Sequence, residues 1–254
     1  MTTAVVLKFV AAIVVGYLLG SIPFGVIVGR RFAGVDVRNY GSGKMGSTNV
    51  LRVAGTKAAA LVFVLDLTKG ALAVVFAWFV LRGQYEAPID SGLWWMLRSA
   101  PALAALAAIG GHVWPIFLKF RGGRGVATFY GGLLALCPPV AFVSGPIAIL
   151  GAGMTRFMSL ASILGAVTAY VMLVPLTVVS GFPWGNLLYG LVGSIAIIAT
   201  HHDNIVRLYN GKERKLGEKA ELTVAPKPTT AQRVRHVADK SLSYLKWSRQ
   251  NLHQ

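Results

Sequence analysis

The chain has 254 residues, of which 55% are hydrophobic and only 13% are charged, and its mean hydropathy is +0.61. This composition excludes an ordinary soluble domain and indicates an all-α, polytopic integral membrane protein, with about 20 residues for each transmembrane helix. The formal net charge of +16 does not indicate nucleic-acid binding, because Lys and Arg lie mostly in short loops between apolar stretches and in the C-terminal tail. One cysteine, Cys137, excludes an internal disulfide and argues against a thiolate metal cluster.

The first apolar stretch covers residues 4–28. It is too long for the core of a signal peptide, so we expect it to remain as a helix. Pro23 lacks a backbone N–H and predicts a kink near the end of this helix. We expect Arg30 and Arg31 to end it.

The second apolar stretch, residues 57–81, contains Asp66 and Lys69, which are three residues apart and therefore share a helix face. Ionisable residues inside a span are costly and usually face a partner or a wet cavity. Two interpretations remain open. The pair is a mutual ion pair that tethers this helix to a neighbour, or it lines a functional site.

Further apolar stretches predict one span each: residues 93–110, 157–180 and 184–200. Residues 126–155 are too long for one comfortable span and are interrupted by Pro138, Pro139 and Pro146. This segment is either one kinked helix or two short ones.

Polar stretches separate the apolar ones at three places: residues 36–52 (DVRNYGSGKMGSTNVLR), 110–128 (GGHVWPIFLKFRGGRGVAT) and 201–215 (HHDNIVRLYNGKERK). The first two are rich in glycine, which permits the positive φ angles that an anion-binding loop needs, and both carry fixed positive charge. Arg124 can bind a phosphate through two parallel hydrogen bonds. We therefore expect these stretches to hold phosphate or carboxylate groups.

A shared site requires all three polar stretches to lie on one side of the membrane. The first and second are separated by two predicted spans, so the third joins them only if residues 126–155 cross twice. The result is about seven transmembrane helices, with the N-terminus outside and the C-terminus in the cytoplasm. The proposed inner side carries 21 of the 25 Lys and Arg residues, which agrees with the positive-inside rule and places the site toward the cytoplasm.

The stretches GSGKMGSTNVLR, GHVWPIFLKFRGGRGVAT and HHDNIVRLYNGKE, with GSIPFG before the first and DLTKG between, resemble the motif blocks of the bacterial acyl-phosphate:glycerol-3-phosphate acyltransferases, often called PlsY. The resemblance covers residues 17–215. It implies a bacterial inner-membrane enzyme of phospholipid biosynthesis that transfers a fatty acyl group from acyl phosphate to the 1-hydroxyl of glycerol 3-phosphate. The implied products are lysophosphatidic acid and inorganic phosphate, and no metal or cofactor is implied.

The resemblance also implies the site residues. His112 and His201 are the candidates to accept the hydroxyl proton, because neutral imidazole is available near neutral pH, unless the donor phosphate takes the proton itself. The residues expected to bind substrate are polar, basic or glycine residues of the three blocks: Ser42, Asn49, Arg52, Gly122, Gly123, Arg124, Gly125 and Asn204. The expected partners are glycerol 3-phosphate, acyl phosphate and membrane lipids, and the sequence predicts no particular oligomeric state.

The chain departs from the family pattern at several positions. Family members usually have Asn in place of Lys44, Ala in place of Ser47 and Lys in place of Arg124, and often Arg in place of His202. Lys44 adds a cation beside the first glycine-rich loop. These departures affect the fine geometry of the site more than the class of reaction.

A non-catalytic membrane protein, such as a transporter of an organic phosphate, is the alternative function. Its site would also need paired basic loops. Transporters often contain internal repeats and bind substrate near the middle of the bilayer. This sequence shows no convincing repeat, and its polar stretches lie at the ends of the predicted spans.

A domain boundary is expected near residue 215. Residues 1–215 form the membrane acyltransferase domain implied by the resemblance. Residues 216–254 form a basic cytoplasmic C-terminal extension, which is either an amphipathic helix on an anionic membrane surface or disordered.

Overall fold

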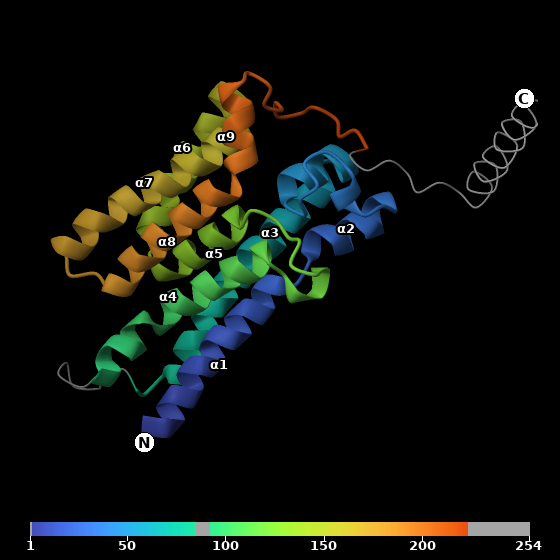
Figure 1. The fold of residues 1–254 in the computed structure, drawn as a ribbon. Coiled ribbons are helices and arrows are strands. Elements are labelled where there is room, and N and C mark those ends of the chain that lie inside the picture. The colour runs from blue at the N-terminus through green and yellow to red at the C-terminus, as the bar shows by residue number, and fades with distance from the viewer. Residues whose placement is uncertain (1, 85–91, 223–254) are drawn as a thin grey trace, which may run out of the picture. The chain divides into compact units, whose positions relative to one another are not determined.

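The computed structural model describes residues 2–84 and 92–222, and the regular elements within them are helices (Figure 1). Their bounds are α1 (Thr2–Ser21), α2 (Phe24–Ala33), α3 (Ser47–Leu81), α4 (Gly92–Val113), α5 (Val126–Leu136), α6 (Pro138–Thr155), α7 (Met158–Val178), α8 (Trp184–Thr200) and α9 (His202–Tyr209), with short 3₁₀ helices η1 (Val37–Asn39) and η2 (Ile116–Leu118). The first unit of the chain comprises Met1–Glu221. The part of the predicted extension beyond residue 222 lies outside the described residues.

Apolar helices dominate the first unit and run side by side along one direction (Figure 1). Among the described residues, five helical segments are long and apolar enough to cross a membrane: Thr3–Ala33, Ser47–Leu81, Leu93–Leu118, Pro138–Thr155 and Met158–Val178. The helices α5 and α8 are apolar but shorter. The expectation of an all-helical membrane protein is confirmed.

The first helix breaks where Pro23 predicts, because α1 ends at Ser21 and α2 begins directly after the proline. The prediction that the arginines end this segment is wrong. The helix α2 continues through Arg30 and Arg31, whose charges are favourable in the last turn of a helix. It ends at Gly34, which adopts a left-handed φ of 67° and donates its N–H to the carbonyl oxygen of Arg30.

The helix α3 consists of two parts that meet at Gly55. This residue has φ 82° and ψ 179°, a conformation open to glycine, and it separates a short N-terminal part from a long apolar part. The predicted span of residues 57–81 corresponds to the long part. The short part, which starts at Ser47, carries the end of the first polar stretch.

The segment 126–155 forms two helices rather than one. The break lies at Cys137, because Pro138 and Pro139 occupy the first turn of α6, where a missing N–H costs nothing. The helix α5 starts at the second polar stretch, and α6 returns to the same end of the unit, where Arg156 and Leu216 exchange hydrogen bonds. With 11 residues, α5 is about 16 Å long, roughly half the thickness of the hydrocarbon core.

Glycines allow the helix backbones to approach closely. A Cβ atom added to Gly16 or Gly20 of α1 would collide with the backbone of Ala104 or Ala108 of α4. Small residues four apart in this way are typical of packed transmembrane helices. The close contact of α1 with α4, and the packing of α3 on α5, fix the positions of the helix ends that carry the polar stretches.

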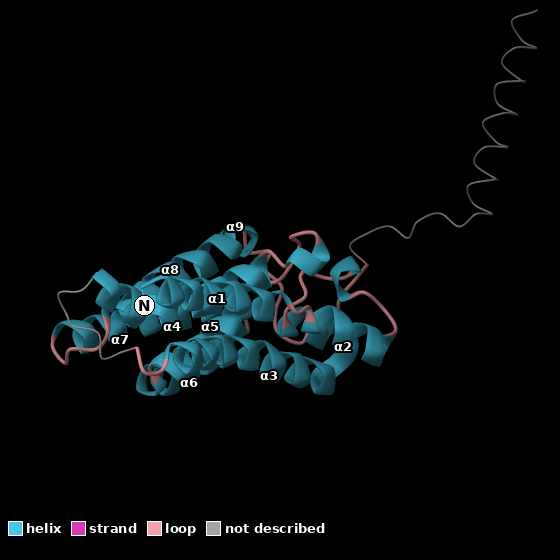
Figure 2. Cartoon of the chain, turned by 90° about the horizontal axis from the view of Figure 1, so that it is seen from below, coloured by secondary structure: helices cyan, strands magenta, loops and turns pink. Residues whose placement is uncertain are grey.

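The polar stretches meet at one end of these helices. The start of α3, the end of α4, the start of α7 and the end of α8 all contribute to one cavity. Figure 2, in which loops are pink, shows loop segments gathered beside α2. The N–H of Gly41 donates to the carbonyl oxygen of Glu221 at 2.9 Å, so the last part of the described chain crosses the first polar stretch.

Candidate active site

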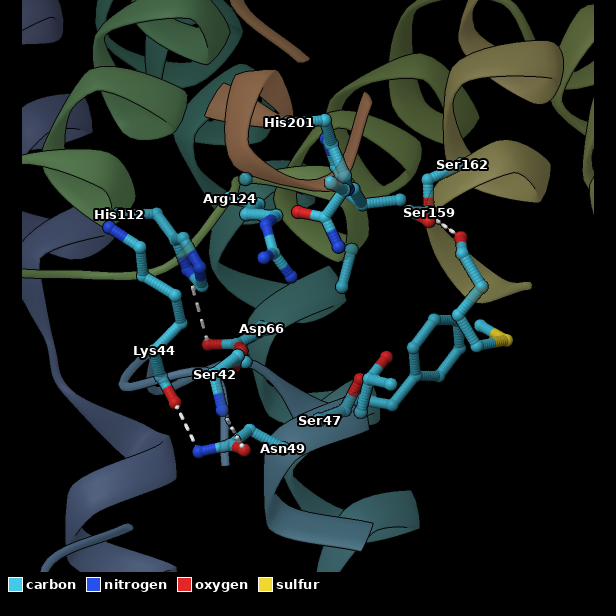
Figure 3. Close-up of a pocket in the computed structure, with 18 of the residues that line it drawn as sticks. Ser42, Lys44, Ser47, Asn49, Asp66, His112, Arg124, Ser159, Ser162 and His201 are labelled. Atoms are coloured by element: carbon cyan, nitrogen blue, oxygen red, sulfur yellow. Dashed lines mark hydrogen bonds and ion pairs between the residues drawn. The ribbon is translucent and has the colours of Figure 1, made fainter. Parts of the chain in front are cut away.

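A cavity of about 110 Å³ lies where the three polar stretches meet (Figure 3). Its lining includes most residues expected from the sequence: Ser42, Asn49, Arg52, His112, Arg124, Gly125, His201 and Asn204. Ser159 and Ser162 of α7 and Glu213 also line it, although the sequence reasoning assigned none of them. The cavity therefore combines side chains from nearly the whole length of the first unit.

Asn49 organises the first polar stretch. Its Nδ2 lies 2.8, 3.0 and 2.9 Å from the carbonyl oxygens of Val37, Tyr40 and Lys44, which share its two hydrogens. Its Oδ1 accepts a hydrogen bond of 3.1 Å from the N–H of Ser42, and the residue is 2% exposed. We expected Asn49 to bind substrate, but its side chain is engaged in shaping the loop. Its contribution is to place Ser42 at the cavity.

Arg52 and Arg124 bring positive charge to the cavity from different parts of the chain. Within residues 2–84 and 92–222, Nε of each is buried without a hydrogen-bond partner, and no carboxylate forms an ion pair with either. Burial lowers the pKa of Arg124 to about 10, so its guanidinium remains protonated near neutral pH. Partly buried cations without a protein partner favour an anionic ligand.

The loop that carries Arg124 is fixed against the end of α4. The N–H groups of Gly122 and Gly123 donate to the carbonyl oxygens of Val113 and His112 at 3.1 and 3.0 Å. We expected both glycines to bind substrate, but these N–H groups are used within the protein. The two glycines line a neighbouring cavity rather than the central one.

Gly125 places the N-terminus of α5 at the central cavity. It is the N-cap residue of α5, with a left-handed φ of 82°, and it lines the cavity together with Val126 and Ala127. Thr200 contacts the preceding turn, because its Oγ1 lies 3.2 Å from the carbonyl oxygen of Arg124 and 3.0 Å from that of Ile197, which share its one hydrogen. The free N–H groups and the dipole of a helix N-terminus attract anions and therefore add to the charge of Arg124.

Glu213 joins α7 to the third polar stretch. Its Oε1 accepts hydrogen bonds from Asn204 Nδ2 at 2.6 Å and from Ser159 Oγ at 3.0 Å. Its Oε2 accepts one from Arg207 Nε at 2.9 Å. Asn204 thus has its amide nitrogen engaged, while its Oδ1 is buried and lacks a partner among the described residues. Glu213 is the last residue of the third motif block, and this position was the sequence signal that could have identified it.

His201 lies at the end of α8 and has a defined hydrogen bond. Its Nδ1 is 2.8 Å from the carbonyl oxygen of Ile197, so this nitrogen carries the proton and Nε2 is the acceptor. Burial, followed by the positive charge of Arg124, lowers the pKa of His201 to about 4. The imidazole is therefore neutral near pH 7 and is suited to accept a hydrogen bond.

The lowered pKa of His201 predicts a loss of stability in acid. Between pH 6.5 and about 4 the unfolded state binds a proton that the folded state does not, so stability falls as the pH falls through this range. The full effect is on the order of 3 kcal/mol. Thermal unfolding in detergent from pH 4.5 to 7.5 will show a smaller acid-induced loss for His201→Gln than for the unaltered protein. The exposed His202→Gln is the control, and parallel curves for all three proteins would contradict the prediction.

His112 and Asp66 both line the central cavity, and their side chains point toward each other (Figure 3). Nδ1 of His112 is 3.6 Å from Oδ1 of Asp66, and Nζ of Lys69 is 2.9 Å from the same oxygen. Both interpretations of the acidic and basic pair in α3 therefore apply. Asp66 forms an ion pair with Lys69 and also lines the cavity.

Lys44 lies at the central cavity and at a second cavity of about 570 Å³. Lys44 lines both cavities, and Arg121 and His202 line the second. The exposed Arg121 and the half-buried Lys44 bring positive charge to the second cavity, which Asp203 also lines.

Comparisons of the sequence with known proteins identify its family. The protein-family model described as glycerol-3-phosphate acyltransferase matches residues 10–211. The chain is 54% identical over 213 residues to glycerol-3-phosphate acyltransferase 3 of Dehalococcoides mccartyi (strain CBDB1), an alignment that covers 84% of this chain and 98% of that protein. The chain belongs to the glycerol-3-phosphate acyltransferase family.

More distant members of the family also match over nearly their full length. The glycerol-3-phosphate acyltransferase of Clostridioides difficile (strain 630) is 38% identical over 216 residues, covering 85% of this chain and 99% of that protein. A crystal structure of PlsY, described as an integral membrane glycerol 3-phosphate acyltransferase in its glycerol 3-phosphate form, matches with a TM-score of 0.70 and 37% identity. It covers 82% of this chain and 96% of that chain. The lysophosphatidic acid form matches with a TM-score of 0.68 and 36% identity.

The resemblance to the PlsY-type acyltransferases is thus confirmed. The chain is a membrane acyltransferase of this family, and the alternative of a non-catalytic transporter is not supported.

Proposed function

We propose that the protein transfers a fatty acyl group from acyl phosphate to the 1-hydroxyl of glycerol 3-phosphate, giving lysophosphatidic acid and inorganic phosphate. The observation that carries this proposal is the pair of partly buried arginines, Arg52 and Arg124, that meet in one cavity without a carboxylate partner among the described residues. Both substrates carry phosphate, so the reaction needs two anion-binding positions. The glycerol 3-phosphate and lysophosphatidic acid forms of the related PlsY crystal structures support the acceptor and the product.

The chemistry requires positioning more than covalent catalysis. Acyl phosphate is an activated mixed anhydride, so the glycerol oxygen attacks its carbonyl carbon, a new ester C–O bond forms, and the bond to the phosphate oxygen breaks. Arg52, Arg124, Ser42 and the N-terminus of α5 hold the phosphate groups and stabilise the negative charge of the leaving phosphate. Asn204 contributes its free Oδ1 as a hydrogen-bond acceptor.

The histidines have different roles in this proposal. His201 is a neutral hydrogen-bond acceptor that orients the attacking hydroxyl, because its low pKa makes it a weak base. His112 faces a carboxylate and accepts the hydroxyl proton, which then passes to the released phosphate.

We also propose the membrane topology. The helices α1 and α3–α8 are seven crossings, with the N-terminus outside and the cavity facing the cytoplasm of a bacterial inner membrane. The positive-inside bias supports this orientation. The directions of α5 and α6 support the topology as well. The helix α5 starts beside the cavity, and α6 ends at the same end of the unit, so the pair crosses the membrane twice in this proposal.

The C-terminal extension, in this proposal, is separate from the reaction. Deleting residues 223–254 retains Glu213 and the bond from Gly41 to Glu221, so we expect turnover to remain within about two-fold. Binding to vesicles that contain anionic lipid should weaken modestly, because the deletion removes basic residues. Complete loss of turnover in a folded truncated protein would contradict this separation.

The deciding experiment supplies purified protein with palmitoyl phosphate and glycerol 3-phosphate. It measures release of inorganic phosphate and formation of lysophosphatidic acid. Palmitoyl-CoA replaces palmitoyl phosphate in a parallel reaction, because only the acyl phosphate should act directly as donor. The absence of product above a no-enzyme control, in protein shown to be folded, would overturn the proposed function.

Lys44 provides a finer test of substrate capture. Replacing it by Asn removes a cation from the approach to the cavity and should raise the KM for glycerol 3-phosphate about three-fold, with kcat nearly unchanged. The difference should shrink as the salt concentration rises. The exposed Lys57→Asn serves as the control for charge alone. If Lys44→Asn and Lys57→Asn raised the KM equally, or if Lys44→Asn changed only kcat, Lys44 would have no specific role in capturing glycerol 3-phosphate.

A further inference from the structure

Two further cavities lie at the end of the first unit that is opposite to the active site. Their volumes are about 280 and 210 Å³, and both are lined by Arg98 of α4 and by Phe182 and Pro183 of the turn between α7 and α8. The other ends of α4 and α7 contribute His112 and Ser159 to the central cavity. Figure 1 shows the start of α4 and the turn between α7 and α8 at the end of the unit away from α9. Neither cavity is therefore part of the acyl-transfer site.

The larger of these two cavities lies beyond the end of a short helix. The helix α5 spans about half of the hydrocarbon core, and its last residue, Leu136, lines this cavity. Asn186 of α8, which is 6% exposed, donates from its Nδ2 to the carbonyl oxygen of Leu136 at 3.3 Å. This bond satisfies a carbonyl group that the end of a helix leaves free. The space beyond Leu136 is left for a molecule from the bilayer.

Arg98 is a cation without a protein counter-ion. It lies about 9 Å along α4 from Gly92, the first residue of that helix. Its guanidinium carbon is 5.6 Å from the centroid of the Trp94 ring. Within residues 2–84 and 92–222 no carboxylate forms an ion pair with it, and no described acidic residue lines either cavity. An ionisable side chain inside a membrane-spanning helix indicates a site for a partner of opposite charge.

The side chains around Arg98 match the chemistry of a lipid headgroup. Trp95 and Trp184 line the smaller cavity and Trp78 lines the larger one, and they are 58%, 55% and 41% exposed. Tryptophan is typical of the level at which headgroups meet the acyl chains. Thr177 of α7 also lines the smaller cavity and is 4% exposed, and its Oγ1 is buried without a hydrogen-bond partner among the described residues. Such a hydroxyl favours a ligand that carries acceptor oxygens.

We propose that Arg98 and these two cavities bind the headgroup of an anionic glycerophospholipid. The guanidinium of Arg98 binds the phosphodiester oxygens, the hydroxyl of Thr177 donates to an ester or phosphate oxygen, and the acyl chains lie along the exposed tryptophans. A lipid fits better than a free phosphate ion, because most of the lining residues are aromatic, proline or aliphatic. Assignment to the outer leaflet rests on the proposed topology, whereas the site itself does not depend on acyl transfer.

Binding of radiolabelled phosphatidylglycerol tests the site in the purified full chain, after removal of co-purified lipid in a neutral detergent. Arg98→Gln should weaken binding about ten-fold, because it removes the charge-assisted hydrogen bonds to the phosphate. The side chain of Arg98 is exposed, so the variant should fold, which thermal unfolding checks.

Arg82→Gln is the matched control. Arg82 is also exposed and lies 5.4 Å from the centroid of the Phe79 ring, but it lines neither cavity. We expect this variant to bind phosphatidylglycerol within about two-fold of the unaltered protein. Equal losses in Arg98→Gln and Arg82→Gln would show a general response to charge and would overturn the proposal.

Competing molecules distinguish the possible ligands. Binding should persist in excess inorganic phosphate, which also occupies the phosphate-binding positions of the active site. Loss of binding in phosphate would show that the cavities take a free anion. Phosphatidylcholine carries the same phosphodiester without a net charge and should displace the label about five-fold less effectively than phosphatidylglycerol. Equal displacement by the two lipids would show that the acyl chains alone are recognised. Either of these contrary results would overturn the proposal.

Thr177→Val tests the hydroxyl with little change of volume. It should weaken binding of phosphatidylglycerol about three-fold. In lipid-free protein it should not lower the midpoint of thermal unfolding, because the hydroxyl it removes has no partner among the described residues. An unchanged lipid affinity would contradict the proposed site. Acyl transfer by Arg98→Gln in detergent should stay within about two-fold of the unaltered protein, so failure of the proposed function and failure of the lipid site are separate outcomes.

Discussion

Arg124→Gln will lower kcat/KM for acyl transfer about 100-fold or more without lowering the midpoint of thermal unfolding. The guanidinium lies at the cavity without a carboxylate partner among the described residues, so its removal costs no ion pair. Catalysis loses the charge that holds phosphate and stabilises the leaving group. The measurements are initial rates over a range of both substrates and thermal unfolding of the same preparation.

Arg121→Gln is the matched control for this experiment. Arg121 lies three residues earlier in the same loop, but its side chain is exposed and does not line the central cavity. We expect this variant to keep kcat/KM within about three-fold. Equal losses in the two variants would show that the loop responds to charge in general. The specific role of Arg124 in binding phosphate would then be wrong.

Glu213→Gln will lower both stability and turnover, which distinguishes it from the arginine variant. The side chain of Glu213 is 4% exposed and accepts hydrogen bonds from Ser159, Asn204 and Arg207. The glutamine amide replaces one acceptor oxygen by a donor nitrogen and leaves Arg207 without its counter-ion. We expect the free energy of unfolding to fall by about 2–3 kcal/mol. Asn204 and Ser159 lose their common partner, so the cavity wall loosens and kcat should fall about ten-fold or more.

The exposed Glu218→Gln removes the same charge from a nearby position and should change neither property. Thermal unfolding and acyl-transfer rates of both variants, measured side by side, give the comparison. A Glu213→Gln protein with normal stability and low turnover would instead place the carboxylate in direct contact with a substrate.

Hydropathy and the prolines were sufficient to predict the apolar helices and the break at Pro23, but not every helix boundary. The stretch at residues 184–200 coincides with α8, and the requirement for a shared site predicted that residues 126–155 turn back. The continuation of α2 through Arg30 and Arg31 was missed, because a pair of charges ends an apolar pattern without ending a helix. The break at Gly55 depends on backbone conformation, which a glycine permits but does not require.

The sequence predicted which residues line the cavity where a charged or imidazole side chain is itself the chemical signal. Arg52, Arg124 and the two histidines were expected at the cavity and line it. Asn49 was expected to bind substrate, yet its hydrogen bonds hold the loop, and only the folded geometry reveals that difference. Ser159 is a common residue at the start of an apolar span, and it gains significance only through its hydrogen bond to Glu213.

The position of Glu213 and Glu221 near the end of the first unit has a consequence for biogenesis. Ribosomes synthesise the first polar stretch early, but its Gly41 bonds to Glu221 and the α7 wall of the cavity bonds to Glu213. A nascent chain that has inserted α1 to α8 therefore still lacks the residues that complete the cavity. Acyl transfer should begin only after synthesis has passed these residues, so chains arrested earlier should be inserted in the membrane but inactive.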